Sequence, residues 1–216
     1  MAQNYASSVT GAAIRATRLN ANGTTATGAS ASYVLNSFIR VSFTPEYEDG
    51  DEITEKTAGG EVCVSYKLPD TLKRVNLEVA ICNPDPEFTE LVSGGSILST
   101  AGESVGYAAA PIGVDALPNG ASLEVWSRAI SGGLVAPVNP YFRWVFPYVQ
   151  LRPSGERVVE NGLMANVFEG FGLGNINWAD GPQNDWAFPS YTDRAYSYAR
   201  VANAPIGMNG FQTPLP

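Results

Sequence analysis

The sequence of 216 residues contains no histidine. Histidine is the commonest general base and metal ligand in proteins, and it completes the Ser-His and Cys-His nucleophile pairs. Its absence argues against an enzyme. We therefore expect no catalytic residues, no metal ligands and no bound cofactor.

Cysteine is scarce, and long hydrophobic runs are missing. The two cysteines are fewer than a secreted disulfide scaffold normally carries. The first residues, Met-Ala-Gln-Asn-Tyr-Ala-Ser-Ser, lack the basic and apolar regions of a signal peptide. No stretch approaches the length of a membrane span. We expect synthesis in a reducing cytoplasm and no membrane partner.

Charged side chains are also few. They make up 16% of the residues, whereas about 25% is usual, and hydrophobic residues make up 44%. Such a composition suits a protein with a sizeable core whose surface is partly covered by partners. The net charge of −8 disfavours binding to nucleic acid phosphates.

What the chain does contain is a series of strand patterns, at residues 12–19, 33–43, 61–67, 72–82, 104–110, 122–130, 141–151 and 163–171. Pro147 indicates a sheet edge or a bulge. One helix is expected over residues 85–93, with Asp85 as N-cap, Pro86 in the first turn and Gly94 or Gly95 at its end. The patterns predict a mainly β fold with one short α-helix.

The clearest hairpin signal joins residues 61–67 to residues 72–82 through Leu68-Pro69-Asp70-Thr71. In that register Cys63 lies opposite Asn76, and Cys82 is a further six residues, or about 20 Å, along the strand. A disulfide cannot span this distance, so free thiols are expected. The residues expected to face a core are Val62, Val64, Tyr66, Val75, Leu77, Val79 and Ile81.

Two regions flank or interrupt this β domain, which we place at residues 1–171. Residues 1–11 are expected to form a flexible arm. Residues 172–216 are rich in aromatic residues, proline and glycine without any periodicity, which indicates an extended C-terminal arm. We expect Trp178 and Trp186 to anchor this arm on its own domain or on a neighbouring subunit.

An acidic segment lies between two expected strands, in a long loop over residues 44–60. Its acids are Glu46, Glu48, Asp49, Asp51, Glu52 and Glu55. Dense like charges resist burial, and loops of this length are commonly functional or disordered. The segment lacks the regular spacing of ligands that a calcium-binding loop requires. It also lacks the two carboxyl groups in unlike environments that a glycosidase requires. A solvated flexible loop and a contact surface remain the alternatives.

Six segments carry a resemblance to a known family. They are ATRL (16–19), FIRVSFTPEYEDGDEITEKTAGGEVCVSYK (38–67), LKRVNLEVAICNPDPEFTELVSGG (72–95), LEVWS (123–127), YFRWVFPYV (141–149) and GNINWADGP (174–182). Together they resemble the major tail proteins, or tail tube proteins, of long-tailed actinobacteriophages. The resemblance covers residues 12–182, and its most specific part is the acidic block followed by Asn-Pro-Asp-Pro-Glu.

The resemblance implies a tail-tube-type β-sandwich or barrel with one flanking helix. It implies a structural virion protein whose hexameric rings stack into a hollow conduit for DNA ejection. The long acidic loop would contact the next ring or face the lumen. Partners would be further copies of the chain, the tape measure protein, and the tail terminator and tip proteins, while duplex DNA would pass without stable binding.

A different class of function remains open beside this one. The chain could be a β-sandwich binding module of a virion surface, for a carbohydrate or a receptor. Trp178, Trp186 and Tyr191 would then form a platform for a sugar ring. Assembly separates the two hypotheses, because a binding module stays small whereas a tube protein polymerises.

Overall fold

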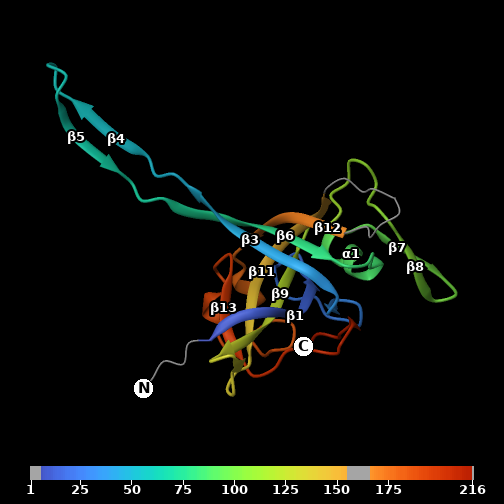
Figure 1. Cartoon of the computed structure of the whole chain (residues 1–216). Helices are drawn as coiled ribbons and strands as arrows, with labels where there is room; N and C mark the ends of the chain where they lie inside the picture. The colour runs from blue at the N-terminus through green and yellow to red at the C-terminus, as the bar shows by residue number, and fades with distance from the viewer. Residues whose placement is uncertain (1–5, 155–165, 216) are drawn as a thin grey trace, which may run out of the picture.

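The structure, a computed structural model, describes residues 6–154 and 166–215 (Figure 1). Strands account for 52% of the described residues and helices for 7%, and these residues contain one α-helix. The prediction of a mainly β fold with one short α-helix is therefore confirmed.

The elements follow one another along the chain as β1 (Ser7–Arg18), β2 (Ser32–Leu35), β3 (Phe38–Glu48), β4 (Glu52–Lys56), β5 (Val62–Lys67), β6 (Thr71–Ile81), α1 (Pro86–Ser93), β7 (Ser96–Thr100), β8 (Glu103–Ala108), β9 (Ala121–Ser131), β10 (Leu134–Val135), β11 (Tyr141–Ser154), β12 (Asn166–Leu173), the 3-10 helices η1 (Ile176–Trp178) and η2 (Pro189–Tyr191), β13 (Ser197–Val201) and β14 (Gly210–Phe211).

One large antiparallel sheet organises the fold. Its strands lie in the order β14-β2-β1-β9-β11-β12-β6-β3, with β10 beside β9 and β13 beside β11. Leu35 of β2 and Val79 of β6 lie in one hydrophobic core, although their strands are near opposite ends of this order. The sheet must therefore be strongly bent. At the open side, the ring of Phe38 in β3 lies directly over Gly11 of β1, where a Cβ atom would come within 2.3 Å of it.

Helix α1 fills the concave side of the bent sheet. Its Asp85 cap accepts a hydrogen bond of 2.8 Å from the backbone N–H of Phe88, and Gly94 ends the helix, both as predicted. Phe88, Leu91 and Val92 are fully buried in the core. The apolar face of the helix therefore supplies part of the core that the sheet encloses.

The C-terminal segment covers the other side of the sheet. Trp178 and Trp186 are buried there against Val145 and Leu19. The segment also adds β13 to β11 and β14 to β2, although no strand periodicity is visible in its sequence. Of the two alternatives for residues 172–216, the described part packs on its own domain.

The expected hairpin between residues 61–67 and 72–82 is wrong. β5 pairs with β4, and β6 pairs with β3 and β12, so Leu68-Pro69-Asp70 joins two strands that run in the same direction along one arm. Val62, Val64 and Tyr66 consequently face solvent, with 50–56% of their surface exposed. The physical reason is that buried β6 needs a hydrogen-bonded neighbour on both sides.

The expectation of free thiols is confirmed, although the register behind it was not. Cys63 lies in the exposed part of the arm, whereas Cys82 follows β6 in the body of the protein. The two residues are therefore separated by the length of β6 rather than by a register offset across a hairpin.

The ends of the predicted strands need smaller corrections. Residues 7–11 belong to β1 and pair with β9, so the flexible arm expected over residues 1–11 is wrong for them; residues 1–5 lie outside the described part of the chain. The strand expected at 33–43 is split at Asn36 and Ser37. Residues 163–165 also lie outside the described residues.

Pro147 sits at a bulge and not at a sheet edge. The register of β11 against β9 shifts between Phe146 and Val149, which is where the missing N–H of proline can be accommodated. Since β11 lies between other strands, it offers no free edge at this point to another subunit.

Candidate functional site

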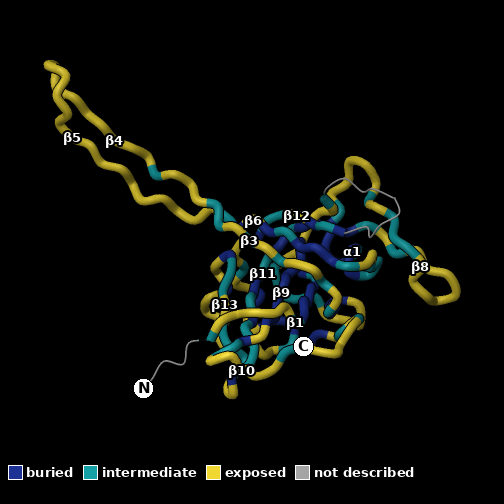
Figure 2. Tube along the Cα trace, in the orientation of Figure 1, coloured by how far each residue is buried: buried dark blue, intermediate teal, exposed yellow. Residues whose placement is uncertain are grey.

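A long hairpin projects from the sheet, and it holds the acidic segment (Figures 1 and 2). Its base is the pairing of β3 with β6, and its outer part is the pairing of β4 with β5. Every residue from 51 to 73 is exposed. The chain reverses at Thr57–Gly60, where the N–H of Gly60 donates to the carbonyl of Thr57 at 2.9 Å.

The acidic residues do not form one loop, which corrects the expectation for residues 44–60. Glu46 and Glu48 belong to β3, and Glu52 and Glu55 belong to β4. Only Asp49 and Asp51, with Gly50 between them, lie outside a strand. Strands form here because pairing lets the backbone N–H and C=O groups make hydrogen bonds. The acidic side chains remain exposed to water in these strands, so pairing does not require their burial.

Among the residues that the structure describes, Glu46 is the one of the six acids that makes ion pairs. Its carboxylate accepts hydrogen bonds from Arg74 Nε at 2.7 Å and from Asn76 Nδ2 at 2.9 Å. These bonds, first from Arg74 and then from Asn76, lower the pKa of Glu46. Glu46 therefore ties β3 to β6 at the base of the hairpin, and the remaining five acids are exposed.

The base and the outer part of the hairpin meet at a short junction, residues 49–51 facing residues 68–70. The N–H of Gly50 donates to Asp70 Oδ1 at 3.0 Å, and the N–H of Leu68 donates to the carbonyl of Asp51 at 3.0 Å. The hydrogen bond from Gly50, together with Lys67 at 3.3 Å, lowers the pKa of Asp70. These contacts hold the outer part in line with the base.

The outer part of the hairpin has two unlike faces. The register pairs Ile53 with Tyr66 and Glu55 with Val64, so these side chains share one face with Val62. Ile53, Val62, Val64 and Tyr66 form what we call the apolar stripe, and each is 50–56% exposed. The opposite face carries Glu52, Thr54, Cys63, Ser65 and Lys67.

This arrangement is unusual for an isolated chain. A two-stranded hairpin is only marginally stable in water, and an exposed row of apolar residues marks an interaction site. The free strand edges of β4 and β5 also offer unpaired backbone groups to another chain. Chemically, the hairpin is therefore suited to binding a protein surface.

A second hairpin, β7–β8, projects next to α1 (Figure 1). Its turn is Ala101-Gly102, and both residues have positive φ angles. Leu98 and Val105 are 50% and 63% exposed. The base of this hairpin is fixed to the body, where the hydroxyl of Tyr107 donates to the carbonyl of Gly94 at 2.8 Å.

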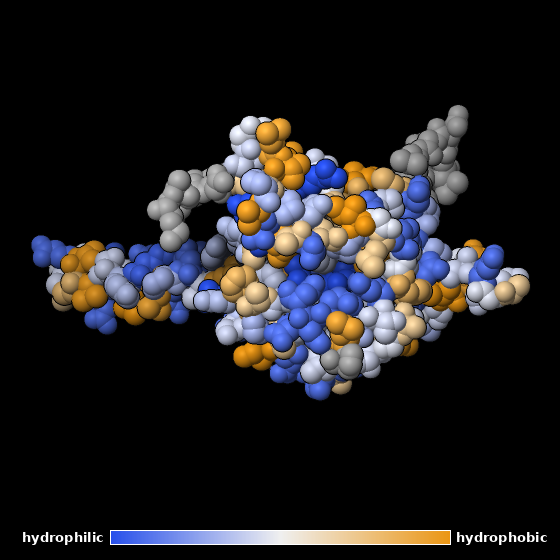
Figure 3. Space-filling view, turned by 90° about the horizontal axis from the view of Figure 1, so that it is seen from below, coloured by the Kyte–Doolittle hydropathy of each residue, from blue (hydrophilic) through white to orange (hydrophobic). Residues whose placement is uncertain are grey.

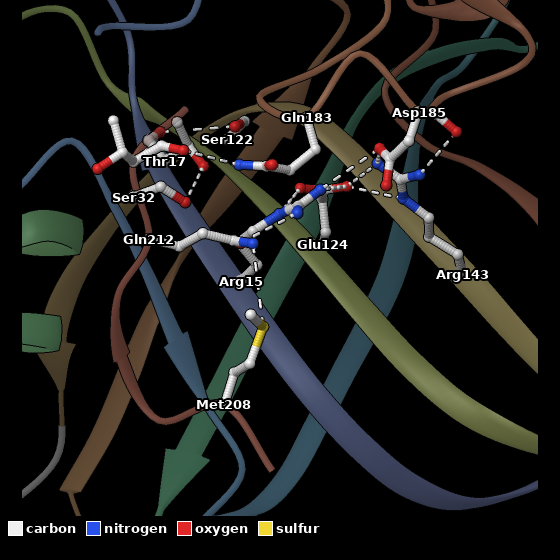
Figure 4. Close-up of polar contacts among 11 residues, drawn as sticks. Arg15, Thr17, Ser32, Ser122, Glu124, Arg143, Gln183, Asp185, Met208 and Gln212 are labelled. Atoms are coloured by element: carbon white, nitrogen blue, oxygen red, sulfur yellow. Dashed lines mark hydrogen bonds and ion pairs between the residues drawn. The ribbon is translucent and has the colours of Figure 1, made fainter. Parts of the chain in front are cut away.

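A buried ion cluster lies under the C-terminal segment, and sequence reasoning missed it (Figure 4). Glu124 of β9 is fully buried and accepts hydrogen bonds from Arg15 Nε at 2.5 Å and from Arg143 Nε at 2.7 Å. Arg143 also pairs with Asp185 at 2.8 Å. The guanidinium groups of Arg15 and Arg143 lie about 5 Å from the ring centre of Trp126.

The cluster is balanced, with two positive and two negative groups. Burial alone would raise the pKa of Glu124, but attraction to Arg143 and Arg15 outweighs burial and lowers this pKa. Burial likewise opposes the charge of Arg143, and attraction to Glu124 and Asp185 reverses the effect, so the pKa of Arg143 is raised. Both shifts favour the charged forms of Glu124 and Arg143, which fits a structural role and not proton transfer.

The tryptophans cannot form the sugar platform of the alternative hypothesis. Trp178 and Trp186 are 1% and 3% exposed, whereas Tyr191 is 49% exposed. A sugar ring stacks on an accessible aromatic face, so the platform predicted from these three residues is wrong. The carbonyl of Phe188 accepts a hydrogen bond from Trp186 Nε1 at 3.0 Å, which fixes the ring inside the domain.

Polar side chains cover the outward face of β3 and β6. Arg40 pairs with Glu78 across the two strands, and Arg74 pairs with Glu46. These two ion pairs neutralise both arginines, so neither is an unpaired cation that would attract a polyanion.

Within residues 6–154 and 166–215, no three cysteine or acidic side chains come together in a group that could hold a metal ion. In the same part of the chain, no helix has the length and apolar character needed to cross a membrane. Comparison with protein-family models and with curated proteins finds no match to this chain.

Proposed function

We propose that this chain is a structural subunit of a phage tail tube. In this proposal six copies form a ring, and rings stack into a hollow conduit through which DNA leaves the virion. The protein is made in the host cytoplasm and resides in the tail. Its further partners are the tape measure protein and the tail terminator and tip proteins, and it catalyses no reaction.

The observation that carries the proposal is the projecting hairpin with its apolar stripe. A monomer leaves four large apolar side chains about half exposed, on an arm that its own body does not cover (Figure 2). Contact with a neighbouring copy would bury them and stabilise the hairpin. The resemblance of residues 38–67 to tail tube proteins supports the same conclusion.

The charges are consistent with a conduit. Duplex DNA carries one negative charge per about 1.7 Å of its axis, so a basic wall would retain it. The chain has a net charge of −8, and the basic side chains on the outward face of β3 and β6 are paired with acids. A lumen built from such a face would let DNA pass.

Electron microscopy of negatively stained protein tests the proposal. We expect the purified wild-type protein at high concentration to form tubes of uniform width. The triple variant Val62→Ser, Val64→Ser, Tyr66→Ser should stay monomeric and folded by circular dichroism, because it loses most of the apolar stripe. The matched control Cys63→Ser, Ser65→Ala changes the opposite face of the same strand and should form normal tubes.

Two results would contradict the proposal. One is a wild-type protein that remains monomeric in sedimentation at every concentration tested. The other is salt-sensitive binding of duplex DNA by assembled tubes at about 50 mM salt, where electrostatic binding is strong. The binding-module alternative predicts the first result.

A further inference from the structure

An exposed groove lies beside the base of the projecting hairpin. It has a volume of ≈790 Å³, and it is formed where β6, the end of β12 and the C-terminal segment meet. Its exposed apolar lining consists of Leu72, Leu173, Phe188, Tyr191 and Tyr198, which are 37–57% exposed. Trp186, Ala195, Tyr196 and Ala199 also line it and are buried or half-buried. We call it the aromatic groove.

The aromatic groove is built on rigid supports. Tyr198 belongs to β13 and its ring packs on Trp144 at 4.5 Å between ring centres. Phe188 packs edge-on against buried Trp186 at 5.5 Å. The ring of Phe188 is thus held by buried Trp186 and the ring of Tyr198 by half-buried Trp144, and both rings keep an exposed surface for a partner.

The occupant is indicated by the chain itself. The groove is large enough for several side chains, since pockets of about 300–1,000 Å³ enclose drug-sized ligands. The apolar stripe presents Ile53, Val62, Val64 and Tyr66 in a row on one face of the hairpin. The hairpin points away from the body, so the stripe does not reach the groove of its own copy (Figures 1 and 3).

The charges of the two surfaces are opposite. Residues 49–67 contain five acidic and two basic residues, a net charge of −3. Lys73 and Arg194 line the groove against one acid, Asp193, a net charge of +1. Both cations are exposed and make only loose ion pairs, Lys73 with Glu46 at 3.9 Å and Arg194 with Asp193 at 3.8 Å. Complementary charge of this kind guides association and fixes register.

We infer that the apolar stripe of one copy docks in the aromatic groove of the next copy. This inference rests on the proposed function, because it needs self-assembly, and it names the two surfaces that meet. The stripe and the groove are different parts of the same chain, so the contact can repeat head-to-tail from copy to copy, as a ring or a stack of rings requires.

Photo-crosslinking in assembled tubes tests the contact. A benzophenone amino acid replaces Tyr66 in the stripe, and a matched variant carries it at Ser65 on the opposite face of β5. Tubes are formed from equal parts of unlabelled and isotope-labelled protein and irradiated. We expect the Tyr66 probe to link to groove residues of another copy, at 72–73, 173–174 or 186–199, shown by mixed-isotope peptides, and the Ser65 probe not to do so.

A substitution in the groove gives a second, independent measurement. Tyr191→Ser removes an exposed ring and leaves the buried tryptophans untouched, so the monomer should fold normally. We expect the protein concentration needed for assembly to rise by about tenfold, which corresponds to about 1.4 kcal/mol. Phe211→Ser, an exposed ring outside the groove, is the control and should leave this concentration unchanged.

The outcomes separate the inference from the proposed function. Tubes whose Tyr66 cross-links map outside the groove residues 72–73, 173–174 and 186–199, or whose assembly is insensitive to Tyr191→Ser, overturn the docking contact and leave the tube function standing. Wild-type protein that forms no tubes overturns both.

Discussion

Replacing Glu124 by glutamine should strongly destabilise the fold. Glu124 is fully buried and holds the guanidinium groups of Arg15 and Arg143, which are each 2% exposed. The substitution keeps the shape of the side chain but leaves Asp185, whose side chain is 51% exposed, as the one acid among the ion pairs of these arginines. Removing one partner of a buried ion pair costs about 3–5 kcal/mol.

That cost is a large share of the total free energy of unfolding, which is about 5–15 kcal/mol for a typical domain. For a chain of this size, 1 kcal/mol shifts the melting temperature by about 2–4 °C, so the variant should melt about 10 °C below the wild type. Scanning calorimetry of dilute monomer measures the shift. Glu169→Gln, an exposed position on β12, is the matched control and should change the stability by less than about 0.5 kcal/mol.

A second variant distinguishes lost charge from lost packing. Replacing Arg15 by Met, Glu124 by Leu and Arg143 by Met removes all three charges and keeps much of the side-chain volume. It should recover most of the stability lost in Glu124→Gln, because apolar replacements of buried ion pairs are often neutral or stabilising. A Glu124→Gln variant within about 1 kcal/mol of the wild type would refute the reasoning.

Because the folded pKa of Glu124 is lowered, its stabilising contribution is complete above the unfolded pKa of about 4.3 and is lost as pH falls through the folded value, so acid unfolding of Glu124→Gln should depend less on pH than that of the wild type. Trp178→Ala should lower the free energy of unfolding by about 3–5 kcal/mol in urea titrations, since it empties a site that is 1% exposed; a loss below 1 kcal/mol would show that the C-terminal segment does not support the fold. Cys63 should react with a thiol reagent in the native protein before the half-buried Cys82, and equal rates would contradict the exposure of the hairpin. Amide exchange of Glu52–Lys56 and Val62–Lys67 should be fast in the monomer and slow in tubes, and unchanged exchange on assembly would place the subunit contact elsewhere.

Local patterns in the sequence determined the individual elements. Alternation of apolar residues marked most strands, and the Asp85 cap with Gly94 bounded the only α-helix among the described residues. Pro147 predicted a sheet edge or a bulge, because a missing N–H is a local property of the backbone, and the bulge is the alternative that is confirmed. Free thiols were also predicted, although the sequence alone assigned the wrong strand partner to the segment around Cys63.

Tertiary structure decided which elements pair and which side chains are buried. The segment Leu68-Pro69-Asp70 has the composition of a turn, but β6 finds its partners in β3 and β12, so the segment became a junction in one long arm. Nothing in the sequence indicated that Arg15, Glu124 and Arg143 cluster. In a strand whose residues alternate between apolar and polar, the charged residues normally face solvent. Strand register and the cover provided by the C-terminal segment bring these three charges together, and both are set by contacts between residues far apart along the chain.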